Sequence, residues 1–287
     1  MYKTIVVGYD ESLSSKAALK EASLRVKEEG GTLYLVHAVY FDQEEFAILP
    51  SQMEKRFEVG THLCLNAKKD LQAEAGLNGN VESIICEGEP PQVIVDTAEG
   101  KKADLIALGT YGRKGLKRLL MGSVTSQVIL NATCDVLVVK RPCTQCAGKY
   151  HSLLVPYDGS ESSKKALSRA CALSKSDGSE VSVLYVIPRY EEMMDFFKTE
   201  SVKKSLYQEA EKIVGGAKKV ADGLGVQIKA VVQDGHAADR IVEIADKMKH
   251  DLIVVGTHGW RGVNKAIMGS TAERVIAQAS CPILVAK

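Results

Sequence analysis

The amino-acid sequence predicts an α/β protein made of two tandem copies of one domain, each with a parallel β-sheet. The segment GTYGRKGLKRLLMGS at 109–123 recurs as GTHGWRGVNKAIMGS at 256–270, and CDVLVVK at 134–140 recurs as CPILVAK at 281–287. Similar segments that recur at a fixed spacing indicate a duplicated domain. Within each copy, short runs rich in Val, Ile and Leu alternate with longer segments of helical periodicity, which is typical of consecutive βαβ units.

The strands are the shortest and most apolar of these segments. LIALG at 105–109 and VLVVK at 136–140 are almost continuously apolar, as expected for parallel strands covered by helices on both faces. In the first copy we expect strands at 4–8, 32–39, 81–86, 104–109 and 135–140, with helices at 13–28, 43–75, 91–99 and 123–132. The expected strands of the second copy are 152–157, 180–187, 226–233, 251–256 and 282–286.

The length of the chain agrees with two domains, because 287 residues are about twice a typical domain length of about 150. The segment RPCTQCAGK at 141–149 interrupts the periodic pattern with proline, glycine and small polar residues, which is typical of a connection. We therefore predict a first domain at 1–142, a linker at 143–149 and a second domain at 150–287.

Charge and hydropathy narrow the choice of partners. The chain has 37 basic and 36 acidic side chains and a net charge of +1, without the basic excess that is typical of nucleic-acid binding. The first residues, MYKTIVVGYDES, contain too short an apolar run for a signal peptide, and no segment reaches the about 18 apolar residues of a membrane span. We expect a cytoplasmic protein that binds neither nucleic acid nor membranes.

Cysteine usage suggests reduced thiols instead of a disulfide framework, because most of the seven cysteines lie in apolar strands or helices. Cys143 and Cys146 form a C-x2-C pattern in the linker, which could be half of a four-thiolate zinc site completed in a homodimer. The chain has no second C-x2-C pattern, so incidental or redox-sensitive thiols are the better interpretation. We predict no metal site.

The repeated glycine-rich segment follows the fourth strand of each copy and ends where a helix begins. Backbone N–H groups in such a loop, together with the positive end of the helix, can bind one anion, and phosphate fits this geometry. We expect Ser123 and Ser270 to be the N-caps of these helices. The alternative is a glycine-rich turn with an ordinary serine cap, and the second occurrence makes it the weaker interpretation. Cationic side chains in the two loops are Arg113, Lys114, Lys117, Arg118, Arg261 and Lys265.

The spacing of these glycines, G-x2-G-x9-G-[ST], resembles the universal stress protein family. Gly109, Gly112, Gly122 and Ser123 fulfil the pattern in the first copy, and Gly256, Gly259, Gly269 and Ser270 in the second. The resemblance covers nearly the whole chain as a tandem pair. It implies two open five-stranded parallel sheets of strand order 3-2-1-4-5 with helices on both faces, a Rossmann-like fold of the adenine nucleotide α-hydrolase type. It also implies binding of ATP or AMP, with Mg²⁺ accompanying ATP.

The same resemblance assigns roles to residues at the ends of the first two strands. Asp10 and Asp158 would bind the adenosine part, although a role in capping the next helix is an equal alternative. Ala38 and Val186 would meet the adenine edge with their backbone. The expected nucleotide-binding residues are Asp10, Ala38, Gly109, Thr110, Gly112, Arg113, Gly122, Ser123 and Val124, and Asp158, Val186, Gly256, Thr257, Gly259, Arg261, Gly269, Ser270 and Thr271.

The predicted function is that of a stress-response regulatory protein with two adenine-nucleotide sites. An ATP-activating enzyme of related fold would carry S-G-G-x-D-S after its first strand, where this chain has GYDES and PYDGS. The sequence shows no catalytic set, so we expect slow ATP hydrolysis at most. A second alternative is an interaction module that binds no nucleotide. The resemblance also implies that the two last strands pair, which makes the domains a pseudo-dimer, and leaves a further homodimer open.

Overall fold

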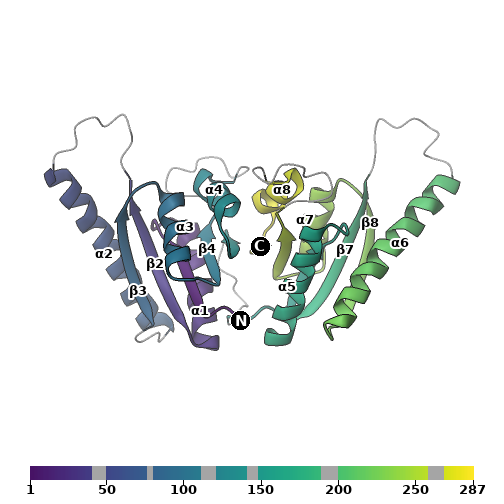
Figure 1. The fold of residues 1–287 in the computed structure, drawn as a ribbon, viewed down its shortest axis with the longest axis horizontal. Helices are drawn as coiled ribbons and strands as arrows, with labels where there is room; N and C mark the ends of the chain where they lie inside the picture. The colour runs from purple at the N-terminus through teal and green to yellow at the C-terminus, as the bar shows by residue number, and fades with distance from the viewer. Residues whose placement is uncertain (41–49, 76–79, 111–120, 141–147, 189–199, 258–267) are drawn as a thin grey trace. The chain divides into compact units, whose positions relative to one another are not determined.

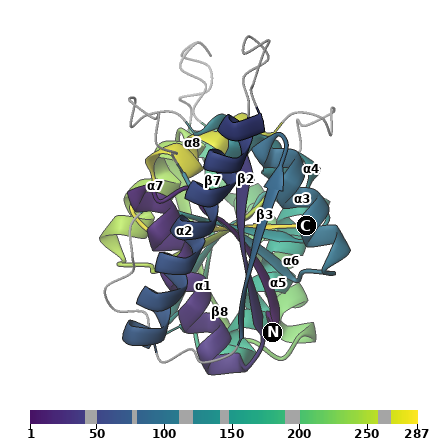
Figure 2. The ribbon, with the colours of Figure 1, turned by 90° about the vertical axis from the view of Figure 1, so that its left-hand side faces the viewer.

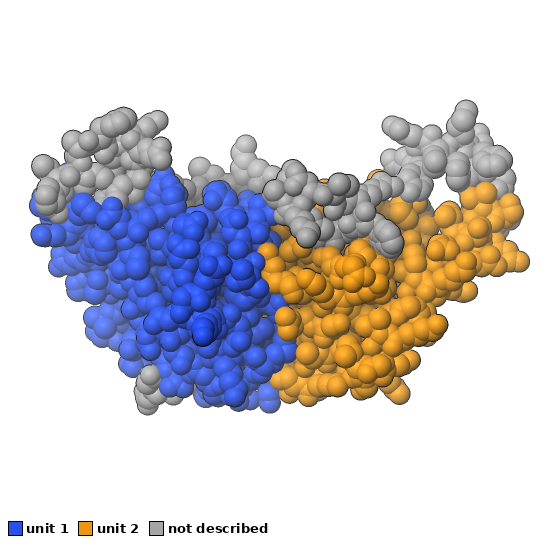
Figure 3. Space-filling model, in the orientation of Figure 1, with its two compact units in different colours: residues 1–149 blue, residues 150–287 orange. Residues whose placement is uncertain are grey.

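The computed structural model describes residues 1–40, 50–75, 80–110, 121–140, 148–188, 200–257 and 268–287 (Figure 1). The chain is divided into two compact units, Met1–Lys149 and Tyr150–Lys287 (Figure 3). Each unit buries its own strands, so each has a hydrophobic core of its own.

The described residues of the first unit form an open five-stranded sheet of order β3-β2-β1-β4-β5, in which every pair of neighbours is parallel. Helices α1 and α2 pack together on one face, and α3 and α4 pack together on the other, as Figure 2 shows. The elements are β1 (Thr4–Gly8), α1 (Leu13–Glu29), β2 (Thr32–Val39), α2 (Pro50–Ala75), β3 (Val81–Glu87), α3 (Pro90–Gly100), β4 (Leu105–Gly109), α4 (Ser123–Asn131) and β5 (Asp135–Val139).

The second unit repeats this topology with the order β8-β7-β6-β9-β10, again parallel throughout. Its elements are β6 (Ser152–Pro156), α5 (Glu161–Asp177), β7 (Glu180–Pro188), α6 (Glu200–Gly223), β8 (Ile228–Gly235), α7 (Ala237–Lys247), β9 (Leu252–Gly256), α8 (Ser270–Gln278) and β10 (Ile283–Ala286). The predicted fold class and the strand order 3-2-1-4-5 are confirmed in both units.

One strand begins later than the sequence predicts. We expected a strand from residue 226, but Val226 N–H donates to the carbonyl of Ala221 at 3.0 Å, which is a bond of the end of helix α6. Gly225 adopts a φ of +66° there, as is common just beyond a helix. The helix end therefore uses residue 226, and β8 begins at Ile228.

A buried imidazole distinguishes the second unit from the first. His250 is 6% exposed, and its Nδ1 lies 2.8 Å from the hydroxyl of Ser152. The Nε2 atom is buried without a hydrogen-bond partner among the described residues. Burial lowers the pKa of His250, although nearby Asp251 opposes this shift. In the first unit Ala103 occupies the equivalent position, directly before the aspartate that precedes β4.

We expect this histidine to make the second unit sensitive to acid. The folded-state pKa lies below the ordinary value of 6.5, so the unfolded chain takes up the proton first and stability falls as the pH drops below about 6.5. The slope for one proton is at most about 1.4 kcal/mol per pH unit. Urea unfolding at about pH 7.5, 6.5 and 5.5 should show a smaller loss for His250→Ala than for wild type, whereas exposed His62→Ala should behave like wild type. Parallel pH profiles for wild type and His250→Ala would contradict this prediction.

Candidate functional site

The predicted site residues that the structure describes gather at the carboxyl edge of each sheet. Strands β1 and β4 are parallel neighbours, but the chain leaves them in opposite directions, toward β2 and toward β5. Ligands of open α/β sheets bind at such a reversal of strand order. In the first unit this edge holds Asp10, Ala38, Gly109, Thr110, Gly122, Ser123 and Val124, and in the second Asp158, Val186, Gly256, Thr257, Gly269, Ser270 and Thr271.

Several predicted residues lie outside the described part of the chain. From the nucleotide site these are Gly112, Arg113, Gly259 and Arg261, and from the linker Cys143 and Cys146. The other loop cations, Lys114, Lys117, Arg118 and Lys265, also lie outside it.

The two aspartates form the turn that precedes a helix. Asp10 Oδ1 accepts a hydrogen bond from Ser12 N–H at 3.0 Å, and Asp158 Oδ1 accepts from Ser160 N–H at the same distance. The serines are the N-caps, because each hydroxyl accepts from the N–H three residues later at 3.2 Å. The alternative in which the aspartates cap the helix is therefore wrong: they make an Asx turn, and serine caps the helix.

The residue after each aspartate has a left-handed backbone. Its φ is +67° at Glu11 and +83° at Gly159. A side chain in this conformation costs about 1 kcal/mol or more, which glycine avoids. The first unit thus carries strain beside Asp10 that the second unit does not carry beside Asp158.

Exchanging these residues should change stability in opposite directions. We expect Gly159→Ala to lower the free energy of unfolding by about 1 kcal/mol, and Glu11→Gly to raise it by up to about 1 kcal/mol. The contact between Glu11 and Lys16, at 3.9 Å and well exposed, should contribute little to the second value. Urea unfolding of both variants measures these shifts, and a shift of the same sign in both would contradict the strain argument.

A part-buried polar contact joins the end of β2 to the same turn. His37 Nδ1 donates to the carbonyl of Tyr9 at 2.8 Å, which places Ala38, the next residue, beside the Asp10 turn. Burial, with help from the nearby carboxylate of Glu11, raises the pKa of Tyr9 to about 12. Tyr9 therefore stays neutral, and the carboxyl groups of this turn come from Asp10 and Glu11. Our sequence analysis missed His37, which the spacing of histidines does not reveal.

The first glycine of each motif is required by packing. A Cβ on Gly109 would lie 2.6 Å from the carbonyl carbon of Ser14 and 2.7 Å from the backbone nitrogen of Ser15. A Cβ on Gly256 would lie 2.6 Å from the carbonyl oxygen of Ser162. These atoms belong to the first turns of α1 and α5, so both glycines let a helix start against the end of a strand.

The last glycine of each motif is the N-cap of the helix that follows. Gly122 N–H donates to Thr110 O at 2.9 Å, and Gly122 O accepts from Ser126 N–H at 3.0 Å. The same pattern places Gly269 at the N-cap of α8. The prediction that Ser123 and Ser270 are N-caps is wrong, because these bonds make the glycines the last extended residues and the serines the first helical ones. No N-cap side chain therefore occupies the first N–H groups of α4 or α8.

Two buried threonines lie at this helix start in the first unit. Thr125, 3% exposed, donates its hydroxyl to the carbonyl of Gly109 at 2.7 Å. The hydroxyl of Thr110, a residue 1% exposed, has no hydrogen-bond partner among the described residues. Our sequence analysis missed Thr125. Comparing the two copies would have pointed to it, since Ala272 stands at the equivalent position.

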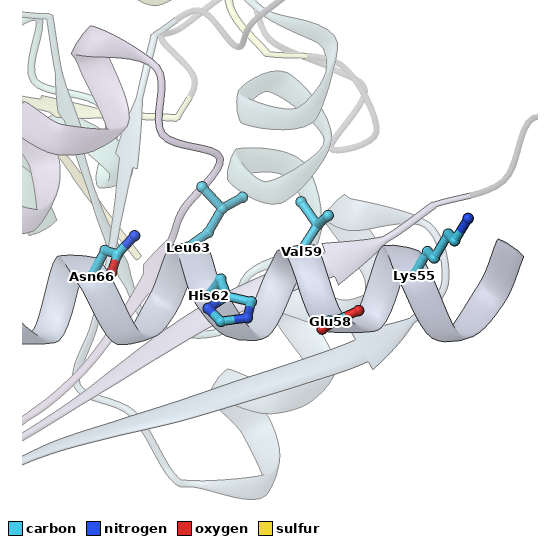
Figure 4. Close-up of a pocket in the computed structure, with 6 residues that line it drawn as sticks. All are labelled: Lys55, Glu58, Val59, His62, Leu63 and Asn66. Carbon is cyan, nitrogen blue, oxygen red and sulfur yellow. The ribbon is translucent and has the colours of Figure 1, made fainter. Parts of the chain in front are cut away.

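Other features of the chain do not involve the predicted site residues. Figure 4 shows a pocket lined by Lys55, Glu58, Val59, His62, Leu63 and Asn66, all on α2 and none a predicted site residue. The described part of the chain contains no cluster of three or more His, Cys, Asp or Glu that could hold a metal ion. It also contains no helix with the length and apolar character needed to cross a membrane. The described cysteines are free thiols, and burial raises the pKa of Cys64 to about 11.

Comparison with known proteins gives consistent results. The model of the universal stress protein family matches residues 1–140 and 149–287. Universal stress protein Rv2005c of Mycobacterium tuberculosis is 26% identical over 295 residues, 99% of this chain and 96% of that protein. Universal stress protein MJ0531 of Methanocaldococcus jannaschii is 36% identical over 144 residues, 48% of this chain and 82% of that protein. A crystal structure of a universal stress protein from Archaeoglobus fulgidus has a TM-score of 0.71 at 19% identity, covers 99% of this chain and 95% of its own, and supports the fold.

Proposed function

Because the chain belongs to the universal stress protein family, we propose that it is a stress-response regulator whose two units each bind one adenine nucleotide, ATP or AMP. The observation that carries this proposal is the start of α4 and of α8 at the carboxyl edge of each sheet. The N-cap of each helix is a glycine, which has no side chain to bond the first N–H groups. The positive helix end and its first N–H groups are thus available to an anion.

The phosphates belong at these helix starts. The first N–H groups of α4 come from Ser123 and Val124, and those of α8 from Ser270 and Thr271. The hydroxyl of Thr110, buried and without a partner among the described residues, is a further donor that fits a phosphate oxygen, since an unsatisfied buried hydroxyl is otherwise costly. Gly112, Arg113, Gly259 and Arg261 are proposed to complete the two sites.

The adenosine end belongs beside the first and second strands. A carboxylate repels phosphate but accepts hydrogen bonds from ribose hydroxyls, so Asp10 and Asp158 favour the sugar at the β1 and β6 turns. Ala38 and Val186 lie near the ends of the adjacent strands β2 and β7, where backbone groups can meet the adenine edge. When ATP binds with Mg²⁺, the phosphate oxygens would carry the ion.

The proposed role is binding and signalling instead of rapid turnover. Phosphoryl transfer needs a group that orients the attacking oxygen and a positive charge that stabilises the transition state. Asp10, which follows β1, already accepts the Ser12 N–H through Oδ1 at 3.0 Å. The arrangement therefore supports nucleotide retention with slow hydrolysis at most.

Three measurements test the proposed function. Mass spectrometry of the gently purified protein should find retained ATP or AMP. Calorimetry with ATP and AMP should show two sites per chain, and the thermal midpoint should rise, because a ligand specific for the folded state stabilises it. GTP is the control for the adenine contact. No heat and no rise in the thermal midpoint at millimolar ATP and AMP would refute the proposal.

A further inference from the structure

The two proposed sites differ where the helix after the glycine-rich loop begins, at the start of α4 and of α8. On the basis of the proposed function, we infer that Thr125 is a positioning residue that makes the first unit bind the nucleotide phosphates more tightly than the second. Thr125 does not need to touch the ligand. It acts by holding the first turn of α4 against the end of β4.

In the first unit two hydrogen bonds fasten this turn. Gly122 N–H donates to Thr110 O at 2.9 Å, and the Thr125 hydroxyl donates to Gly109 O at 2.7 Å. The second bond joins residues 16 positions apart across the ends of the loop. Thr125 is 3% exposed and the bond is part-buried, so water competes less for this hydroxyl than at the surface, and the bond helps to hold the geometry.

In the second unit one of these bonds is missing among the described residues. Gly269 N–H donates to Thr257 O at 3.1 Å, but Ala272 stands where the first unit has Thr125, and its methyl group cannot donate. Ala272 is also buried, at 9% exposure. Of these two hydrogen bonds, the described residues of the first unit make both, and those of the second unit make only the one from Gly269.

This difference should appear as a difference in affinity. N–H donors that are already in place bind an anion without the cost of ordering them. Removing one hydrogen bond of this kind should weaken phosphate binding by about three- to tenfold. The first site should have the lower dissociation constant for ATP by about that factor, although other differences between the loops add to it.

The test isolates each site and exchanges the residue. Gly269→Val is expected to disable the second site, so that only the first site binds ATP. In that background Thr125→Val should raise the dissociation constant for ATP about three- to tenfold. Thr125→Ser, which keeps the hydroxyl, should retain most of the affinity. Gly122→Val leaves the second site, and there Ala272→Thr should lower the dissociation constant. The increase in ATP affinity of Ala272→Thr is the decisive result. A threonine that only stabilised the fold would change the free energy of unfolding but not the affinity for ATP.

The outcomes separate this inference from the proposed function. If wild type binds no nucleotide, the proposed function fails and this inference fails with it. If wild type binds two nucleotides but Thr125→Val and Ala272→Thr leave both dissociation constants unchanged, the proposed function stands and this inference is overturned. Urea unfolding of each variant without ligand shows that the variant is folded before its affinity is measured.

Discussion

Valine in place of Gly122 is expected to weaken ATP binding at the first site by about 100-fold or more while leaving the fold intact. Gly122 has φ −63° and ψ 145°, a conformation that every L-residue adopts, so no backbone strain results. A branched side chain at the N-cap would cover the first N–H groups of α4 and block the approach of phosphate. Losing two hydrogen bonds to a charged group costs about 3 kcal/mol or more, which corresponds to this factor.

Gly269→Val is the matched variant for the second site, since Gly269 has φ −62° and ψ 134°. Calorimetry with ATP should give one site for each single variant and none for the double variant. The thermal midpoints without ligand should fall only slightly, because valine is a poorer N-cap residue than glycine. Two sites of undiminished affinity in the double variant would show that the phosphates do not bind at these helix starts.

Alanine in place of Gly109 should cause a large loss of stability, whereas valine in place of Gly122 should mainly lower ATP affinity. Its Cβ would lie 2.6 Å and 2.7 Å from backbone atoms of Ser14 and Ser15, which cannot move aside without shifting the start of α1. Overpacking of this kind costs about 1–3 kcal/mol. Urea unfolding should show a lower midpoint for Gly109→Ala and, for the same reason at α5, for Gly256→Ala.

The control for this loss is Gly100→Ala at the end of α3. A Cβ on Gly100 would meet no atom within 4 Å, so its stability should be unchanged or slightly higher. If Gly109→Ala were as stable as Gly100→Ala, the packing role of Gly109 would be refuted. With the Gly122 variant, the experiment separates a glycine that the fold requires from one that the ligand requires.

Most of the fold could be predicted because its signals are local. LIALG and VLVVK were predicted as strands covered on both faces, and β4 and β5 are buried in this way. The duplicated glycine motif located the loop after the fourth strand in each copy. The start of β8 could not be predicted, because it depends on the hydrogen bond by which Val226 closes α6, and the alternating pattern does not reveal that bond.

The candidate site was predicted in part. The sequence placed Ala38 and Gly109 at the carboxyl ends of strands, and Asp10 and Gly122 beyond such ends, and the structure places them there. Their individual roles as ligand-binding residues stay a prediction. The helix caps were predicted wrongly because serine and aspartate in D-x-S, and glycine and serine in M-G-S, are all acceptable N-caps by composition.

The sequence by itself determined the doubled α/β fold and the position of the loop, because apolar periodicity and repetition are properties of neighbouring residues. Only the tertiary structure decided that Gly109 must lack a side chain, that Gly122 is the N-cap of α4, and that the Thr125 hydroxyl donates to the carbonyl of Gly109. Each of these depends on a distance between atoms of separate elements. Such distances are set only when β1, α1, β4 and α4 pack together at the edge of the sheet.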